Sequence, residues 1–247
     1  MMKFLFIGSP NYSFNGSVEI ILTGNTLPNL TFFGNFPILR QPRIIGVLGV
    51  LSLHGAVRNI TWTRLAQTAS AGSNLIILNT PVDWQIGDEI IITTTDTSLS
   101  HTERHQIALM ENGTNIRTVA SLAYDHRVIQ QTLGSRMNVD VAAAVGLLTR
   151  NIRIINPSPS SDYSGFRILV SLNQTASFIS NRTIANYGLL KGSAQLSNVQ
   201  FMGFGQFDDS PFSDQYAGIY LNQLGNFSTA QATYIDRCSF DGGYNGA

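Results

Sequence analysis

Cysteine is almost absent from the sequence, with Cys238 the only one in 247 residues. A single cysteine excludes an internal disulfide and, taken alone, favours a reducing compartment. Charge is also scarce, because only 12% of residues are charged and the net charge is zero. The basic residues are scattered singly and form no stripe or patch of the kind that nucleic-acid-binding domains carry. We therefore expect no nucleic-acid partner.

Long hydrophobic runs are missing as well. No stretch approaches the ~18 consecutive apolar residues that a membrane-spanning helix needs, and the N-terminal half contains no long amphipathic helix. Phosphate loops, nucleophile elbows, zinc-protease helices and C-x-x-C pairs are absent too. What is abundant is Ser, Thr, Asn and Gly, together with Ile, Leu, Val and Phe. This composition is typical of an all-β protein with many turns.

The sequence contains eight N-x-[ST] glycosylation triplets, at Asn11, Asn15, Asn29, Asn59, Asn112, Asn173, Asn181 and Asn226. With 20 asparagines and 43 serines and threonines, chance alone gives about three or four such triplets. The excess indicates a glycosylated, extracellular chain, against the indication of the single cysteine. The alternative is that a chain rich in these residues produces the triplets by accident.

The stretch from Thr80 to Ile92 predicts a β-hairpin. Val82 and Trp84 alternate with polar residues, Gly87 marks a tight turn, and an isoleucine run follows. Further strands are predicted at residues 4–24 (two strands), 44–55, 62–65, 74–78, 107–109 and 116–122, with a turn at residues 111–113. Residues 25–43 contain three prolines and are predicted to be a loop, and residues 66–72 a single helical turn.

From about residue 140 the pattern changes. Residues 145–156 predict a strand that ends in a polar corner, and related patterns recur at residues 196–203 and 235–242. The last two superpose at a spacing of 39 residues. Short strands are predicted between the three patterns, at residues 165–170 and 217–221. Short strands that recur with Asn and Gly at their corners are typical of a β-solenoid, in which each coil stacks its apolar side chains on the next. An antiparallel sandwich with accidental similarity is the alternative.

Several ordered motifs resemble a known family. They are L-S-L-H-G (51–55), N-I-T-W-T-R-L (59–65), A-G-S (71–73), V-D-W-Q-I-G-D-E-I (82–90), V-G-L-L-T-R-N-I-R-I (145–154), L-S-N-V-Q-F (196–201), G-Q-F (205–207) and Y-I-D-R-C-S-F (234–240). Together they resemble the G8 domain and the parallel β-helix behind it. The resemblance is strongest to the fibrocystin and fibrocystin-L family and more distant to the cell-surface hyaluronidase group.

The resemblance implies a G8 domain at residues 1–140, followed by the first coils of a right-handed parallel β-helix at residues 141–247. Both parts are expected to be incomplete, so the chain would be a fragment of a larger membrane-anchored protein. The glycines of the family have plausible counterparts at Gly8, Gly16, Gly24, Gly46, Gly49, Gly55, Gly72 and Gly87. Structural roles are expected for Gly55, Trp62, Gly72, Trp84 and Gly87.

The acidic cluster of Asp83, Asp88 and Glu89 has two interpretations. It could be a cation site or a glycosidase pair, which needs two carboxyl groups ~5–10 Å apart. Alternatively, Asp83 and Asp88 cap the turn around Gly87 while Trp84 packs beneath it, and this structural interpretation is favoured.

Histidines provide further candidates. His101, Glu103 and His105 alternate, so on a strand they would share one face and could bind a metal, although a solvated polar loop is favoured. His54 is expected to be a hydrogen-bonded turn residue, and Asp125 and His126 form a lone acid–imidazole pair.

Two groups in the C-terminal half complete the candidates. Asp208, Asp209 and Asp214 lie in a loop with Pro211 and could bind calcium, but they lack EF-hand spacing. Exposed aromatics could stack on sugars or, as favoured, pack between coils; they are Tyr187, Phe204, Tyr216 and Tyr220.

The sequence and the resemblance together predict an extracellular, non-catalytic receptor or adhesion segment. It would act at the outer face of the plasma membrane or after secretion, without a cofactor or metal. Its partner would be an extracellular protein or polysaccharide of unknown identity. The alternative is a hyaluronan-degrading enzyme with Asp83, Asp88 and Glu89 as its carboxylates and calcium as its candidate cofactor.

Overall fold

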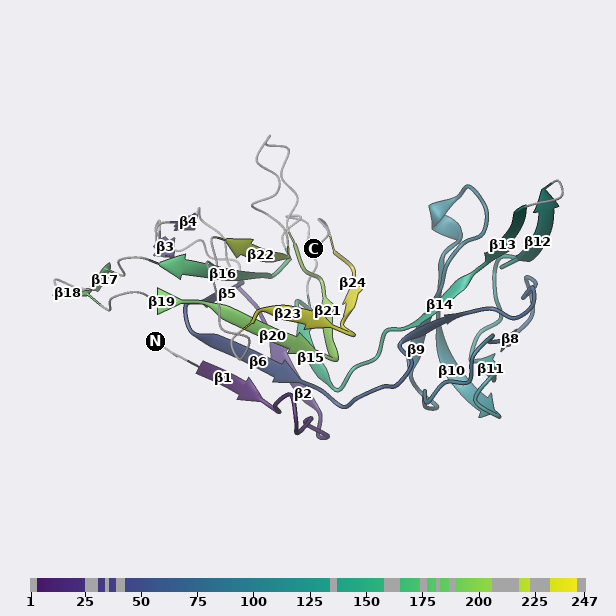
Figure 1. Cartoon of the computed structure of the whole chain (residues 1–247), viewed down its shortest axis with the longest axis horizontal. Helices are drawn as coiled ribbons and strands as arrows, with labels where there is room; N and C mark the ends of the chain where they lie inside the picture. Colours follow the sequence, from purple (N-terminus) through teal and green to yellow (C-terminus); the bar gives the residue numbers. More distant parts are fainter. Residues whose placement is uncertain are drawn as a thin grey trace. The chain divides into compact units, whose positions relative to one another are not determined.

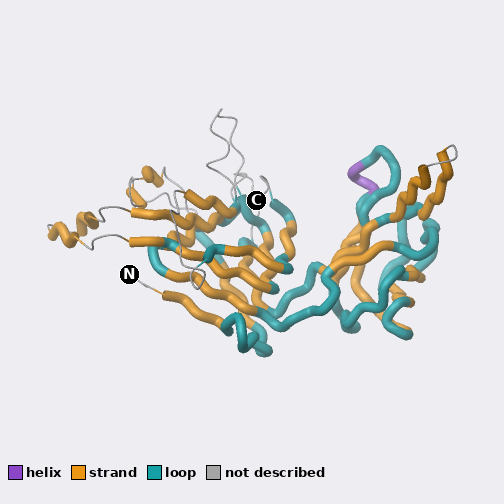
Figure 2. Tube along the Cα trace, viewed as in Figure 1, coloured by secondary structure: helices purple, strands orange, loops and turns teal. Residues whose placement is uncertain are grey.

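The computed structural model describes residues 4–24, 31–33, 36–38, 43–133, 137–157, 165–173, 177–180, 183–186, 190–205, 218–222 and 232–243. Within these ranges the chain consists of strands and loops, with one 3-10 turn, η1 (Leu99–His101), as seen in Figure 2. The all-β fold class is confirmed. None of the described helical structure is long and apolar enough to cross a membrane.

The chain forms two compact units, one made of residues 1–56 and 150–247 and the other of residues 57–149. We call the first the parallel unit and the second the antiparallel unit, after the pairing of their main sheets.

The parallel unit contains three sheets whose strands pair in parallel (Figure 1). The first sheet comprises β1 (Phe4–Ile7), β6 (Val50–His54), β20 (Ser193–Ser197) and β23 (Tyr234–Asp236). The second comprises β2 (Val18–Ile21), β15 (Ile152–Ile155), β21 (Val199–Met202) and β24 (Ser239–Asp241). The third comprises β5 (Ile44–Val47), β16 (Arg167–Asn173) and β22 (Ile219–Asn222).

Three short additions accompany these sheets. β19 (Leu190–Lys191) pairs antiparallel with the end of β16. Two small hairpins are formed by β3 (Thr31–Phe33) with β4 (Phe36–Ile38) and by β17 (Ser177–Ser180) with β18 (Thr183–Asn186). The first hairpin lies in the segment that the prolines predicted to be a loop, so strands form there as well.

The order in which the chain visits the sheets makes the parallel unit a parallel β-helix. After β1 and β2, each coil supplies a strand to the third, first and second sheets in turn: β5, β6 and β15, then β16, β20 and β21, then β22, β23 and β24. The 39-residue repeat is confirmed by the register, since Leu196 pairs with Ile235 and Phe201 with Phe240. The parallel pairing excludes the antiparallel sandwich for this unit.

The core of this unit is built from side chains stacked in register along the second sheet. Ile20, Ile154, Phe201 and Phe240 occupy equivalent positions in successive coils. Ile154 and Phe201 are fully buried, and the rings of Phe201 and Phe240 are stacked with their centroids 4.9 Å apart. Because burying such a side chain stabilises a protein by about 1.5–3 kcal/mol, each coil is stabilised by the next.

The corner between the first and second sheets is very short in the last two coils. Asn198 joins β20 to β21 and Arg237 begins the link from β23 to β24, both with a left-handed backbone at φ 54° and 51°. Asparagine tolerates this conformation well, whereas arginine rarely adopts it.

At the same corner of the preceding coil, residues 57–149 are inserted between β6 and β15. Asn151 holds this corner together. Its side-chain amide donates to the carbonyl oxygens of Phe14 and Gly16, both at 2.6 Å, and its Oδ1 accepts from the backbone N–H of Ala56 at 2.8 Å. A Cβ on Gly55 would lie 2.4 Å from the carbonyl oxygen of Asn198, so this corner has room only for glycine.

The two units differ from the predicted division at residue 140. The N-terminal strands β1, β2, β5 and β6 pair in parallel with strands from the C-terminal half, so they belong to the same β-helix. The strand predicted at residues 145–156 is two strands, β14 (Ala144–Leu147) in the antiparallel unit and β15 in the parallel unit.

The antiparallel unit is a six-stranded sheet in the order β7 (Trp62–Arg64), β14, β9 (Glu89–Ile92), β10 (Glu103–Glu111), β11 (Asn115–Thr118) and β8 (Leu75–Ile77). Its outer strands also meet: Leu65 bridges Leu78, and the N–H of Asn79 donates to the carbonyl of Arg64 at 2.8 Å. The sheet therefore closes on itself. A hairpin of β12 (Val128–Leu133) and β13 (Met137–Ala142) is attached to it.

Isoleucines fill the interior of this unit, and Ile76, Ile90, Ile92, Ile107 and Ile116 are all fully buried. The turn predicted at residues 111–113 is confirmed, since β10 and β11 pair on either side of it.

Two local predictions for this unit are wrong. Residues 80–84 form no strand. The turn at Gly87 is followed by β9 but is not preceded by a strand, so the predicted hairpin does not exist. Residues 66–72 form no helical turn, because Ala69 is held in an antiparallel bridge to His126.

We predict that Asn151→Ala lowers the free energy of unfolding of the parallel unit by about 1–3 kcal/mol, because three backbone groups lose their partner. Asn74→Ala is the matched control: this asparagine is exposed, so the change should stay within about 0.5 kcal/mol. Urea unfolding followed by far-UV circular dichroism measures both variants. Both tryptophans of the chain, Trp62 and Trp84, lie in residues 57–149, so fluorescence follows the antiparallel unit separately. Equal losses for the two variants would refute the role of Asn151.

Candidate functional site

The acidic residues of the 83–89 cluster are each committed to a structural contact. The Oδ2 of Asp83 accepts from the N–H of Asn59 at 2.9 Å, while its Oδ1 is buried without a hydrogen-bond partner. The Oδ2 of Asp88 accepts from the N–H of Gln85 at 2.8 Å and lies 3.4 Å from Arg58. Asp88 therefore caps the turn that begins at Gln85, whereas Asp83 bonds to a different segment, at Asn59.

Glu89, unlike the other two carboxylates, has its partner on a neighbouring strand. It forms an ion pair with Arg104 across the paired strands β9 and β10, 2.5 Å apart and partly exposed. Such a pair contributes little to stability because solvent screens it.

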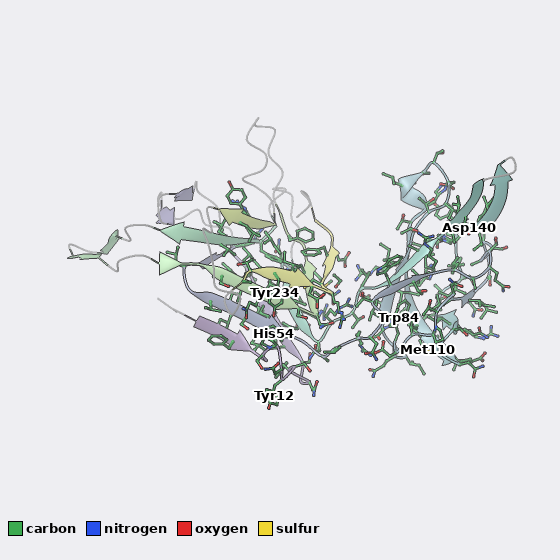
Figure 3. The ribbon with its side chains drawn as sticks, in the orientation of Figure 1. Tyr12, His54, Trp84, Met110, Asp140 and Tyr234 are labelled. Carbon is green, nitrogen blue, oxygen red and sulfur yellow. The ribbon has the colours of Figure 1, made fainter. Side chains whose placement is uncertain are left out.

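Trp84 and Gly87 lie in the same segment as the acidic cluster and have structural roles there. Trp84 is only 3% exposed, its Nε1 donates to the carbonyl of Ile60 at 2.6 Å, and Figure 3 shows it among the strands of its unit. Gly87 and Gly72 have φ values of 91° and 83°, a conformation that favours glycine. Trp62 differs from Trp84, because it is 60% exposed on β7 and contributes little to the core.

The alternating residues His101, Glu103 and His105 do not come together as one site. His101 lies in η1, where its Nδ1 is 2.6 Å from Oδ2 of Asp96 and its ring stacks on Tyr124 with centroids 4.0 Å apart. Glu103 and His105 lie on one face of β10, and Nε2 of His105 is 3.1 Å from Oε2 of Glu103. Among the described residues, no group of three His, Cys, Asp or Glu side chains is arranged to hold a metal.

Glu103 is instead the centre of a buried hydrogen-bond cluster. Its Oε2 accepts from the N–H of Ala123 at 2.7 Å and from His105, and its Oε1 accepts from the N–H of Tyr124 at 2.9 Å and from Nε2 of His126 at 2.9 Å. Burial acts to raise the pKa of Glu103, but these hydrogen bonds outweigh it and lower the pKa to about 2. Glu103 is therefore a carboxylate at neutral pH.

The fully buried His126 lies between two hydrogen-bond acceptors. Its Nδ1 lies 2.9 Å from the carbonyl oxygen of Thr93, and its Nε2 lies 2.9 Å from the carboxylate of Glu103. Both of these partners are acceptors. His126 and Glu103 thus form a buried hydrogen-bonded pair, and backbone groups supply further partners to both side chains.

The surface of the antiparallel unit is hollowed beside Ala123 and Tyr124, which are bonded to Glu103. The hollow has a volume of about 440 Å³ and is lined by Ala71, Thr95, Asp96, His101, Ala123, Tyr124, Asp125, Arg127 and Ile129. The carboxylate of Glu103 holds the backbone of Ala123 and Tyr124, so the buried pair fixes one wall. This hollow collects more polar side chains of different chemistry than the 83–89 cluster, and we take it as the candidate site.

The remaining predicted residues lie elsewhere. His54 ends β6 and is buried, with its Nε2 3.0 Å from Oγ of Ser52, and burial lowers its pKa. Phe204 is buried in the core of the parallel unit, and Tyr220 is half-buried on β22. Five other candidates lie outside the described residues: Tyr187, Asp208, Asp209, Asp214 and Tyr216.

Four of the eight glycosylation triplets have exposed asparagines: Asn11, Asn15, Asn59 and Asn112. Asn173 ends β16, where the structure describes the backbone alone, and Asn29, Asn181 and Asn226 lie outside the described residues.

Comparison with known proteins adds the family. Residues 4–66 match the model of the G8 domain. Human fibrocystin-L is 36% identical to the chain over 241 residues, which is 95% of this chain and 5% of that protein. Fibrocystin of Canis lupus familiaris is 32% identical over 73% of this chain and 4% of its own length. The resemblance to the fibrocystin group is confirmed.

The G8 match and the structural units do not coincide. The G8 residues include β1, β2, β5 and β6 of the parallel unit and extend into β7 of the antiparallel unit. The chain spans only about a twentieth of the length of the fibrocystin-L proteins that it matches. Among solved structures, the tailspike gp49 of Pseudomonas phage LKA1 covers 87% of this chain and 30% of its own, with 14% identity and a TM-score of 0.30.

The hydrogen-bonded pair of Glu103 and His126 is the feature that the sequence did not indicate. Both residues were noted, Glu103 in an alternating motif and His126 beside Asp125, but 23 positions separate them. His126 is held next to Ala69 by an antiparallel bridge, which no periodicity in the sequence indicates. The solvated polar loop favoured for this motif is wrong for Glu103 and His105, because both lie on one face of strand β10 and His105 is buried.

We predict that Glu103 stabilises the protein in a pH-dependent way. Because its folded-state pKa of about 2 lies below the ordinary value of 4.5, its contribution is fully present above pH 4.5 and is lost as the pH falls toward 2. The difference in unfolding free energy between the native chain and Glu103→Gln should narrow by up to about 3 kcal/mol over this window.

Chemical denaturation at a series of pH values measures this difference. Glu111→Gln, on the same strand and exposed, is the control and should show little dependence on pH. A constant difference for Glu103→Gln from pH 5 to 2 would show that the carboxylate is not held as described.

Proposed function

We propose that this chain is a non-catalytic scaffold segment of an extracellular, fibrocystin-like cell-surface protein. The observation that carries the proposal is the insertion of the antiparallel unit at one corner of a parallel β-helix, in a chain similar to fibrocystin-L over nearly its whole length. The β-helix supplies a rigid support, and the inserted unit supplies the surface that a partner contacts.

The bonding of the acidic cluster supports a structural role. Asp83 and Asp88 each bind a backbone N–H, and Asp88 and Glu89 each face an arginine. A glycosidase needs one carboxyl group protonated and another free to act on the sugar. The backbone and arginine partners that these carboxylates already have suit a turn cap or a cross-strand ion pair better than a general acid.

The exposed asparagines support an extracellular location. Asn59 and Asn112 sit in exposed turns of the antiparallel unit, and Asn11 and Asn15 in the turn between β1 and β2. Attached glycans would shield these edges from other chains. We propose that the segment belongs to a larger membrane-anchored chain, and that its partner is an extracellular protein or polysaccharide.

We predict that the chain, when secreted from animal cells, carries N-linked glycans on the exposed triplets. Asn59→Gln should remove one glycan and its shift in electrophoretic mobility, whereas Asn79→Gln, an exposed asparagine outside any triplet, should leave the pattern unchanged. Treatment with an N-glycosidase should collapse the remaining forms. Absence of glycans from all four exposed sites would contradict the extracellular proposal.

The rival function, hyaluronan degradation, is favoured by one observation: the Oδ1 of Asp83 is a buried carboxylate oxygen without a partner. We predict that labelled hyaluronan keeps its length when it is incubated with the chain or with a longer ectodomain, with or without calcium. Cleavage that Asp83→Asn or Asp88→Asn abolishes would sink the non-catalytic proposal. Asp140→Asn is the control, since Asp140 is an exposed residue of β13 (Figure 3).

A further inference from the structure

The hollow on the antiparallel unit has walls that are fixed before any ligand arrives. Asp96 accepts from Oγ1 of Thr94 at 2.7 Å and from the N–H of Ser98 at 2.8 Å, and it faces His101. Asp125 accepts from the N–H of Ala71 at 2.9 Å. A rigid site loses little conformational entropy on binding, so this degree of order suits recognition.

The wall formed by Ala123 and Tyr124 is hydrogen-bonded to the interior of the unit. The backbone N–H groups of Ala123 and Tyr124 donate to Glu103, whose other partners are the buried His105 and His126. The N–H of Arg127 donates to Oγ1 of Thr95, which joins the two sides of the hollow. The position of the Tyr124 ring is therefore set by contacts that reach into the core.

The charges of the hollow nearly cancel. Asp96 and Asp125 are opposed by Arg127, and His101 adds a positive charge when it is protonated. This balance does not match a polyanion or a polycation. The carboxylate, guanidinium, imidazole and phenol groups of the hollow place hydrogen-bond donors and acceptors close together. This mixture matches hydroxyl groups, because a hydroxyl group can both donate and accept.

An aromatic surface lies beside these polar groups. Tyr124 is 38% exposed, and its ring is stacked on His101 with an interplanar angle of 18°. The stack presents a flat, partly apolar face next to a phenolic hydroxyl. A sugar ring combines an apolar C–H face with a rim of hydroxyls, so it complements both halves of this surface.

We propose that the hollow is a binding site for a neutral saccharide, taking one or two sugar residues. Its volume of about 440 Å³ lies within the range of about 300–1,000 Å³ that is usual for small-molecule sites. The C–H face of the sugar packs on Tyr124, Asp125 accepts from its hydroxyls, and Arg127 donates to them. The site goes beyond the scaffold function proposed above, which does not require the hollow to bind anything, so either can fail alone.

The test uses the complete 247-residue chain, produced in bacteria so that it carries no glycans. Saturation-transfer NMR with the neutral sugars glucose, galactose, mannose and N-acetylglucosamine and their disaccharides identifies a ligand. Chemical shifts of the backbone amides then report where it binds. We expect at least one neutral sugar to bind, with shifts concentrated at residues 95–101 and 123–127.

Variants locate the contacts. Tyr124→Ala and Asp125→Asn should each weaken binding of the sugar tenfold or more. Arg127→Gln, which changes an exposed side chain, should weaken it several-fold. Tyr12→Ala, which removes a highly exposed tyrosine of the parallel unit, and Asp140→Asn should leave the affinity unchanged. Backbone amide spectra of each variant verify that the antiparallel unit remains folded, and Arg127→Gln keeps the test valid if Tyr124→Ala does not fold.

Several results would overturn the proposal. They are no binding of any neutral sugar, binding that all three variants leave unchanged, and binding confined to anionic chains such as hyaluronan or heparin fragments. Preferential binding of short peptides in the same hollow would also overturn it, and would assign the site to a protein partner instead.

Discussion

Register between parallel strands is the constraint on which this structure depends. In the second sheet each strand places its side chains directly on those of the preceding coil, as Ile20, Ile154, Phe201 and Phe240 show. A shift by one residue would move these side chains from the core to the surface. The corners must therefore keep every strand in step, and this explains why Asn198 and Arg237 accept a left-handed backbone.

Much of the fold could be predicted because it repeats. The 39-residue spacing that relates Leu196 to Ile235 is visible in the sequence, and the register reproduces it. The insertion could not be predicted, because the strand that precedes it, β6, and the strand that follows it, β15, look continuous with their neighbours in composition. Residues 145–156 illustrate this: one apolar run serves two strands in different units.

The candidate site was harder to predict than the fold, because its chemistry depends on tertiary contacts. Local pattern correctly placed Asp88 as a cap of the turn before β9, and it allowed but did not favour the strand that has Glu103 and His105 on one face. It could not show that His126 lies between the carbonyl of Thr93 and the carboxylate of Glu103, since the three residues come from separate segments. Their meeting explains how the carboxylate of Glu103 is tolerated in the interior, because each of its oxygens has hydrogen-bond partners.

The corner at Asn151 has a consequence for how such a protein can change over evolution. Asn198 alone spans the equivalent corner one coil later, whereas here 93 residues leave after Ala56 and return at Arg150. The two ends are joined by the hydrogen bond between Ala56 and Asn151, so the β-helix can keep the same corner geometry whatever lies between them. A corner of this kind is a point at which whole domains can be acquired, exchanged or lost while every coil of the β-helix keeps its place.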